Sequence, residues 1–147
     1  TVSWATSLRG RCGVAAKILK ADDDSARADE CRRRLLQDEV SMLVALQGHP
    51  NIINFYGLFH VGDFEGRDPA DGGALPTCMT LELCPGDLKL EARRACGEDL
   101  AGRVAHDALS ALHWMHEKGF AHRDVKPANL LVRRDGAVVL ADFGLAC

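Results

Sequence analysis

The sequence has no long apolar run, no opening stretch that resembles a signal peptide and no strong excess of charge of one sign. Its apolar runs are far shorter than the roughly 20 residues that a membrane-spanning helix requires. The opening residues TVSWA do not form the basic and then apolar segments of a secretory signal. The net charge of -3 gives no reason for binding to nucleic acid or to an anionic membrane surface. We therefore expect neither a nucleic acid nor a membrane among the partners.

The cysteines do not form a recognisable pattern either. All six are scattered singly, and no C-x-x-C pair occurs among them. This spacing argues against a structural zinc site. Without a secretory signal, single cysteines fit a reducing compartment, so we expect the cytoplasm or the nucleus. Repeats and low-complexity tracts are absent as well.

The apolar residues that are present predict a mixture of strands and helices. Short apolar runs bounded by Gly, Pro, Asn and Asp predict strands, and three- and four-residue spacing predicts helices. The strands are expected at residues 1–6, 12–20, 52–61, 78–83, 130–132 and 137–140, and the helices at 28–46 and 98–118. Asp135-Gly136 is a strong hairpin signal between the last two strands. This order predicts an α+β protein with two lobes joined near residues 82–88.

The strongest functional signal is the polar stretch HRDVKPANLL at residues 122–131. A solvated loop can have the same composition, but the spacing also suits chemistry. Asp124 can accept the proton of an attacking hydroxyl, and Lys126 can offset the charge of a transferring phosphoryl group. Asn129 and Asp142, at the two ends of the hairpin, offer oxygen atoms that suit Mg²⁺. A base, a cation and two metal ligands are the parts that phosphoryl transfer requires.

The stretch HRDVKPANLL and the later DFGLA at residues 142–146 resemble the catalytic loop and the metal-binding motif of eukaryotic protein kinases. The resemblance implies an α+β, protein-kinase-like fold. Its N-terminal β-sheet lobe, with one inserted helix, would cover residues 1–83, the hinge 84–88, and the incomplete, mainly helical C-terminal lobe 89–147. The resemblance also implies an ATP- and Mg²⁺-dependent kinase that acts on protein substrates. Lys126, two residues after the catalytic Asp, is typical of the serine/threonine type.

The resemblance also assigns roles within the catalytic loop and the DFG motif. Asp124 would position the acceptor hydroxyl and Lys126 would contact the phosphoryl group. Asn129 and Asp142 would ligate the metal. Arg123 resembles the arginine that grips a phosphorylated activation loop.

A second catalytic pair is implied in the N-terminal half. VAAK at residues 14–17 resembles the strand motif whose lysine contacts the α- and β-phosphates, so Lys17 is the candidate. Its acidic partner would be Glu39 on the following helix. An exposed surface position is the alternative for each, and Asp38 competes with Glu39. Glu39 is preferred because Leu43, one turn on, would then face the core.

Further residues match positions around the nucleotide and in the core. The ATP-binding candidates are Val2, Ala15, Lys17, Leu81, Glu82, Cys84, Asp87 and Leu131. A helix cap is the alternative role for Asp87, and the hinge is one residue shorter than the common pattern. The stacked column that aligns the two lobes of active kinases would comprise His122, Phe143, Leu43 and Phe55. Simple core packing is compatible with each of these roles.

Parts of the family domain have no counterpart in the sequence. A G-x-G-x-x-G loop does not precede TVSWAT, and no A-P-E motif follows DFG. We therefore expect these 147 residues alone to transfer little phosphate to protein, because the substrate platform is missing. The alternative is a non-catalytic, kinase-like module that binds nucleotide or protein. A further alternative is a small-molecule kinase of the aminoglycoside-phosphotransferase type. Such kinases use the same set of Asp, Asn and Asp residues but lack the HRD-x-K-P-x-N motif.

Overall fold

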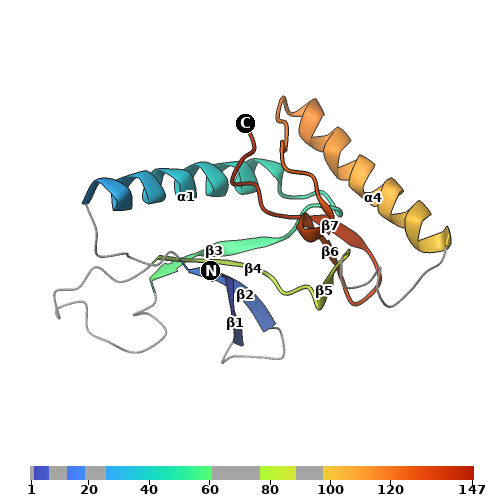
Figure 1. Ribbon diagram of the computed structural model, residues 1–147, viewed down its shortest axis with the longest axis horizontal. Helices are drawn as coiled ribbons and strands as arrows, with labels where there is room; N and C mark the ends of the chain where they lie inside the picture. The colour runs from blue at the N-terminus through green and yellow to red at the C-terminus, as the bar shows by residue number, and fades with distance from the viewer. Residues whose placement is uncertain (1, 7–12, 19–25, 61–76, 89–97) are drawn as a thin grey trace. The chain divides into compact units, whose positions relative to one another are not determined.

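The computed structural model describes residues 2–6, 13–18, 26–60, 77–88 and 98–147 (Figure 1). The chain divides into two compact units. The first comprises Thr1–Arg34 and Asn54–Leu83, and the second comprises Leu35–Ile53 and Cys84–Cys147. Helix α1 (Ala26–Leu46) runs from the first unit into the second. Among the described residues, no helix combines the length and the apolar character that crossing a membrane would take.

The first unit contains a four-stranded antiparallel sheet. Its strands lie in the order β1 (Val2–Thr6), β2 (Gly13–Ile18), β4 (Thr77–Glu82) and β3 (Phe55–His60). Side chains alternate between the two faces of each strand. Ala16, Cys78 and Thr80, which are buried, therefore share one face. The four expected strands are confirmed, although β3 begins three residues later than residue 52.

The second unit holds a small antiparallel sheet with the strand order β5 (Gly86–Asp87), β6 (Leu130–Val132) and β7 (Val138–Leu140). Strands β6 and β7 form the expected hairpin. Gly136 has φ 86°, and its N–H donates to the carbonyl of Arg133. Asp135-Gly136 therefore forms the predicted turn. Gly136 ends this turn in the left-handed region of backbone conformations, which glycine adopts without steric cost.

The outer edge of β7 is paired with the segment that follows α1. Ile52 and Leu140 form a parallel bridge. The N–H of Leu140 donates to the carbonyl of Asn51 at 2.8 Å, and the N–H of Ile53 donates to the carbonyl of Leu140 at 3.1 Å. The expectation that the strand begins at residue 52 was wrong, because Ile52 and Ile53 lie beside Leu140 of β7, whereas Asn54 bonds to β4 through its carbonyl.

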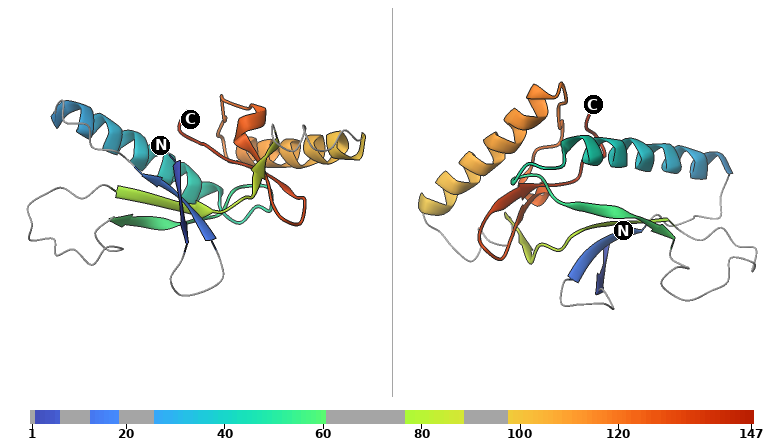
Figure 2. Two further views of the ribbon diagram at one scale, coloured as in Figure 1. Left: turned by 60° about the horizontal axis from the view of Figure 1, so that its bottom comes forward. Right: turned by 180° about the vertical axis from the view of Figure 1, so that it is seen from behind.

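Two helices supply apolar faces to the second unit. Along α1, Leu36, Met42, Leu43 and Leu46 are buried at helical spacing, while Leu35 and Val44 are exposed. Along α4 (Glu98–Glu117), Ala111 and Met115 are fully buried. Helix α4 lies beside the β6–β7 hairpin (Figures 1 and 2). The strand β7 is buried at all three residues, so it forms the centre of this unit.

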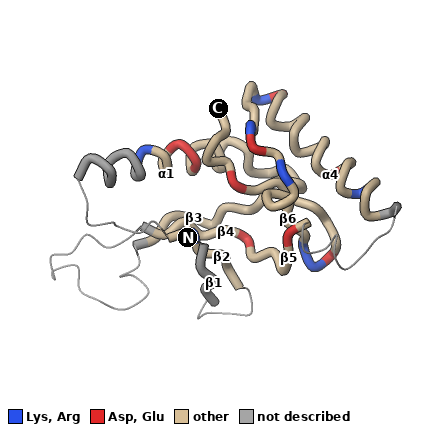
Figure 3. The backbone as a smooth tube through the Cα atoms, viewed as in Figure 1, with Lys and Arg blue, Asp and Glu red and all other residues tan. Residues whose placement is uncertain are grey.

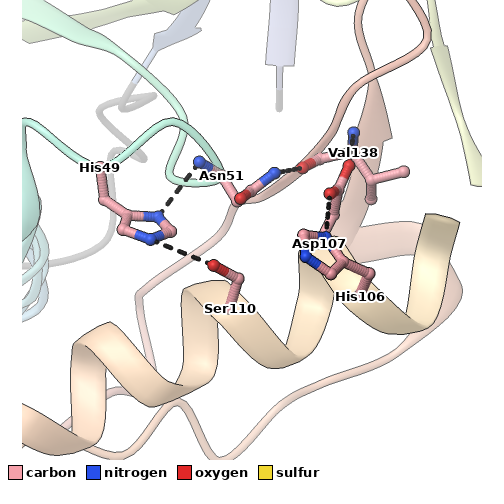
Figure 4. A network of polar contacts seen from close by, with 6 residues as sticks. All are labelled: His49, Asn51, His106, Asp107, Ser110 and Val138. Carbon is pink, nitrogen blue, oxygen red and sulfur yellow. Dashed lines mark hydrogen bonds and ion pairs between the residues drawn. The ribbon is translucent and has the colours of Figure 1, made fainter.

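Side chains of α4 hold the turn that ends α1. The indole Nε1 of Trp114 donates to the carbonyl of Leu46 at 3.0 Å. The ring of His49 stacks on Trp114, with centroids 5.5 Å apart, and Lys118 Nζ lies 4.4 Å from the ring centroid of Trp114. His49 Nε2 lies 3.3 Å from Ser110 Oγ (Figure 4). The C-terminal end of α1 is thus tied to α4 by polar contacts as well as by packing.

The protonation state of His49 follows from its partners. The N–H of Asn51 donates to His49 Nδ1 at 3.1 Å, so Nδ1 carries no proton (Figure 4). The neutral ring then holds its proton on Nε2, from which it donates to Ser110 Oγ. Burial lowers the pKa of His49 below 6.5. Protonation would place a second N–H against the N–H of Asn51.

We predict that the free energy of unfolding decreases as the pH falls through about 6.5 toward the lower folded-state pKa of His49. The unfolded chain binds the His49 proton more readily than the folded chain, so stability is lost on acidification and is fully present above the unfolded pKa. Urea unfolding at several pH values measures this slope. His49→Gln should be less stable near neutral pH but should show a shallower slope between pH 5 and 7. An unchanged slope would contradict the assignment.

Candidate active site

The loop that follows α4 is anchored by the buried His122, which is 1% exposed. Its Nε2 lies 3.1 Å from the carbonyl of Ala141, and its Nδ1 accepts the N–H of Asp124 at 3.3 Å. The acceptor role of Nδ1 places the ring proton on Nε2, which donates to Ala141. The ring also meets Phe143 edge-on, with centroids 5.1 Å apart. His122 therefore connects the polar loop to the segment that carries Asp142.

Two side chains of this loop converge on the carboxylate of a third residue, Asp124. Lys126 Nζ contacts Asp124 Oδ2 at 2.6 Å. The amide of Asn129 donates to the same oxygen at 3.0 Å and to the backbone carbonyl of Asp124 at 2.9 Å. Acidic and basic residues alternate along this part of the chain (Figure 3). The predicted base, cation and amide are thus brought together.

The electrostatics follow from these bonds. The hydrogen bond from Lys126, with that from Asn129 beside it, lowers the pKa of Asp124 below its ordinary value. The same bond from Asp124, helped by the charge of Asp142, raises the pKa of Lys126. Asp124 is therefore a carboxylate and Lys126 an ammonium group at neutral pH. A carboxylate in this state can accept a hydrogen bond from an incoming hydroxyl.

Asp142 lies where the chain leaves β7. It is exposed and has φ 63°, in the left-handed region that costs a non-glycine residue of the order of 1 kcal/mol or more. The N–H of Ala141, the preceding residue, donates to the carbonyl of Asn129 at 2.9 Å. That bond brings the backbone of the two predicted metal ligands side by side.

The donor atoms of this pair fit a hard cation. Both hydrogens of the Asn129 amide point to Asp124, so its oxygen is the end that can ligate. With the carboxylate of Asp142 it makes an oxygen-only set, which suits Mg²⁺ better than Zn²⁺. The described parts of the chain contain no cluster of three or more His, Cys, Asp or Glu residues suited to a metal. Two protein ligands are typical for Mg²⁺, which retains waters and takes phosphate oxygens.

Arg123 has a different environment from that of its neighbours. It is exposed, has φ 61°, and its Nε donates to the carbonyl of Leu145 at 2.6 Å. Two residues on, Cys147 exchanges backbone bonds with Ala121 at 2.8 and 3.1 Å. The side chain of Arg123 therefore holds the segment after the DFG motif by a bond to the backbone of that segment. Its predicted contact with a phosphorylated loop stays a prediction.

Glu39 lies on the buried face of α1 and is 6% exposed, whereas its competitor Asp38 is exposed. A Cβ placed on Gly144 would lie 3.8 Å from Glu39 Oε2 and 3.7 Å from Asp142 Oδ1. Glu39 thus reaches the DFG segment inside the second unit. Lys17 belongs to the first unit, so its predicted pairing with Glu39 stays a prediction.

The sheet of the first unit aligns several of the nucleotide candidates. Ala15 on β2 is directly opposite Leu81 on β4, and Lys17 is opposite both Met79 on β4 and Val2 on β1. Ala15 and Lys17 are two residues apart and therefore point to the same face as Leu81. The side chain of Val2 lies outside the described residues. Backbone register thus brings the predicted residues of β2 and β4 to one face.

The end of β4 is held by the residue that precedes β3. Asn54 Nδ2 donates to Glu82 Oε2 at 2.9 Å, and the N–H of Glu82 donates to the carbonyl of Asn54 at 2.9 Å. The N–H of Glu82 is therefore committed to the protein. The predicted contact of Glu82 with the adenine stays a prediction.

In the second unit, Asp87 on β5 pairs with Leu131 on β6. The sequence did not predict β5, because a two-residue strand carries no hydrophobic periodicity. Asp87 ends this short strand and directly precedes the helical residue Leu88, so its predicted ribose contact and its alternative role as a helix cap both stay predictions. Cys84 is buried, and Leu43 and Phe143 are each 1% exposed. Phe55 lies on β3 in the first unit, half-buried, so its place in a column with Leu43 stays a prediction.

Sequence reasoning missed two polar residues of the second unit, Asn51 and Asp107. Both bond to Val138 of β7, from the turn after α1 and from α4 respectively. The only available signals were that Asn51 follows a helix-ending Gly-His-Pro and that Asp107 lies on the apolar side of α4. An acid on the inner side of a helix is partly buried and needs a partner, and that signal could have identified Asp107.

Comparison with known proteins gives a consistent result. The family model described as protein kinase domain matches residues 1–147. Mitogen-activated protein kinase kinase kinase 1 of Arabidopsis thaliana is 36% identical over 132 residues, which are 90% of this chain and 20% of that protein. Human myosin-IIIa is 35% identical over 118 residues, which are 76% of this chain and 7% of that protein. A serine/threonine-protein kinase of Arabidopsis thaliana is 32% identical over an alignment of 151 residues, which covers 99% of this chain and 27% of that protein. The chain thus spans about a quarter or less of these relatives.

We predict that Lys126→Met raises the pKa of Asp124, because the largest stabilisation of its carboxylate is removed. Carbon-13 NMR titration of the aspartate side chains measures this pKa directly. Lys118→Met, which removes a lysine that contacts Trp114 and not Asp124, is the matched control. An Asp124 titration that is the same in both variants would contradict the geometry of the loop.

Proposed function

The chain belongs to the protein kinase domain family, and on that premise we propose that it carries the phosphoryl-transfer site of an ATP-dependent protein serine/threonine kinase. The observation that carries this proposal is the convergence of Lys126 and Asn129 on the carboxylate of Asp124. Serine/threonine protein kinases among the relatives, such as the one that matches 99% of the chain, support the acceptor class. The substrates are Ser and Thr hydroxyls of proteins.

The residues of the catalytic loop divide the work. Asp124, held ionised by Lys126, accepts a hydrogen bond from the acceptor hydroxyl and orients its oxygen toward the γ-phosphate. Lys126 places its ammonium group beside that carboxylate, where it also offsets the charge of the transferring phosphoryl group. Asn129 fixes the loop through its two donor bonds. Catalysis by such a site is mostly positioning and electrostatics.

The nucleotide and metal are held by separate groups. Asn129 Oδ1 and the carboxylate of Asp142 would ligate Mg²⁺, which neutralises phosphate charge when bound. The face of the first sheet that includes Ala15, Lys17 and Leu81 would receive the nucleotide, with Lys17 on the phosphates. Glu39, which is buried beside Gly144, would be the acidic partner of Lys17.

We also propose that the protein functions in the cytoplasm or the nucleus. Cys78, Cys84 and Cys147 are free thiols in the described part of the chain, and two of them are buried. Free cysteines are typical of reducing compartments. Fluorescence microscopy of the tagged whole protein in its own cells tests this location, and accumulation in the secretory pathway would contradict it.

We predict that the whole protein transfers ³²P from γ-labelled ATP to Ser or Thr of a protein such as myelin basic protein or casein. Asp124→Asn should lower kcat by about 10²- to 10⁴-fold, because the orienting carboxylate is lost. Asp142→Asn should abolish activity that depends on Mg²⁺. His113→Ala, an exposed position on α4, is the control.

The outcomes separate the candidate functions. Transfer that is lost in Asp124→Asn and retained in His113→Ala supports the proposed kinase. Nucleotide binding without transfer, in the wild-type protein and with all acceptors, would replace it with a non-catalytic module. Transfer to a small molecule but not to protein would move the activity to another class of acceptor.

A further inference from the structure

The backbone of Val138 is held on both of its hydrogen-bonding groups by side chains from elsewhere in the second unit. Its N–H donates to Asp107 Oδ2 at 2.9 Å, and its carbonyl accepts from Asn51 Nδ2 at 2.9 Å (Figure 4). Asp107 belongs to α4 and Asn51 to the turn after α1. The two side chains therefore cap the outer edge of β7 at its first residue.

Two members of this cap are buried and the third, Asp107, is partly buried. Asn51 is 7% exposed, and Val138 is 1% exposed. Burial acts to raise the pKa of Asp107, but hydrogen bonds from Val138, His106 and Asn51 outweigh it and leave that pKa below its ordinary value. A buried amide that loses such a partner keeps the full cost of its desolvation. The loss of either side chain would therefore leave a polar group at the edge of β7 without its partner.

The strand that is capped leads directly to Asp142. After Val138, the N–H and the carbonyl of Leu140 bond to residues 51 and 53, and the N–H of Ala141 bonds to Asn129. Asp142 follows with φ 63°. A non-glycine residue keeps that conformation only when its surroundings determine it fully. The cap at Val138 and the bonds at Leu140 are what determine the path of the chain into Asp142.

We propose that Asn51 and Asp107 are positioning residues for Asp142, which set where its carboxylate meets the metal without touching the metal themselves. The inference rests on the proposed function, in which Asp142 ligates Mg²⁺. Groups that orient metal ligands from behind typically change metal affinity by about 10- to 100-fold when they are replaced. Because Asn51 lies in the turn tied to the end of α1, the same cap links the helix that carries Glu39 to the strand that leads to Asp142.

The variants follow from the hydrogen-bond chemistry of the cap. Asn51→Asp keeps the shape but cannot donate to the carbonyl of Val138, and it places a second carboxylate beside Asp107. Asp107→Ala removes the acceptor for the N–H of Val138, whereas Asp107→Asn retains an acceptor oxygen there. Ser110→Ala is the matched control, because it removes a polar contact between α4 and His49 but none with β7.

The measurement is the dissociation constant of the whole protein for the non-hydrolysable analogue AMP-PNP, with Mg²⁺ and with EDTA. The ratio of the two constants is the gain in affinity that Mg²⁺ provides. We expect Asn51→Asp and Asp107→Ala to reduce this gain by about 10-fold. Asp107→Asn should restore most of it, and Ser110→Ala should leave it unchanged. Melting temperatures are recorded for every variant.

A purely structural role predicts a different pattern. Lower melting temperatures for Asn51→Asp and Asp107→Ala, with the wild-type Mg²⁺ gain, would overturn the inference, as would a wild-type protein that shows no gain. If Asn51→Asp does not fold, the comparison of Asp107→Ala with Asp107→Asn decides. A wild-type protein that transfers no phosphate, but whose Mg²⁺ gain depends on the cap, would refute the proposed function and retain this inference.

Discussion

The second unit depends on the need to satisfy every backbone group of a buried strand. Strand β7 is buried along its whole length, so its N–H and carbonyl groups cannot be left to water. One edge is paired with β6, and the other is shared by the backbone of residues 51–53 and the side chains of Asn51 and Asp107. The end of α1, the helix α4 and the hairpin are therefore arranged around one strand of three residues.

The polar loop uses that arrangement as its support. His122 bonds to Ala141 and packs against Phe143, so the loop is joined to the chain just beyond β7. Asn129 bonds to Asp124 through its amide and to Ala141 through its backbone carbonyl. The carboxylate that would orient the acceptor and the one that would hold the metal thus share a framework. Such preorganisation is the main contribution that a protein makes to phosphoryl transfer.

The sequence predicted the parts of this site whose signal is local. Asp124, Lys126, Asn129 and Asp142 lie within about twenty residues of one another in the sequence. The α+β class was predicted from the order of the segments with strand and helix periodicity. Glu39 is buried and Asp38 is exposed, as expected from the helical spacing that relates Glu39 to the buried Leu43, while the pairing of Glu39 with Lys17 stays a prediction. These features need only a short stretch of chain to become visible.

Features that depend on distant segments were not predicted. Ile52 and Ile53 look like the start of a strand, yet their partner is Leu140, nearly ninety positions away in sequence. The strand β5 exists only because β6 lies beside it. The left-handed conformations of Arg123 and Asp142 were not predicted either, because neither residue is a glycine.

The central claim is that the loop after α4 and the DFG segment form one phosphoryl-transfer site. A crystal structure of the whole protein with Mg²⁺ and AMP-PNP tests it most directly. The account predicts a metal ion at about 2.0–2.1 Å from Asn129 Oδ1 and a carboxylate oxygen of Asp142. It also predicts that Asp124 faces the γ-phosphate and retains its contact with Lys126. A metal ion bound elsewhere, or a nucleotide whose phosphates point away from Asp124, would contradict it.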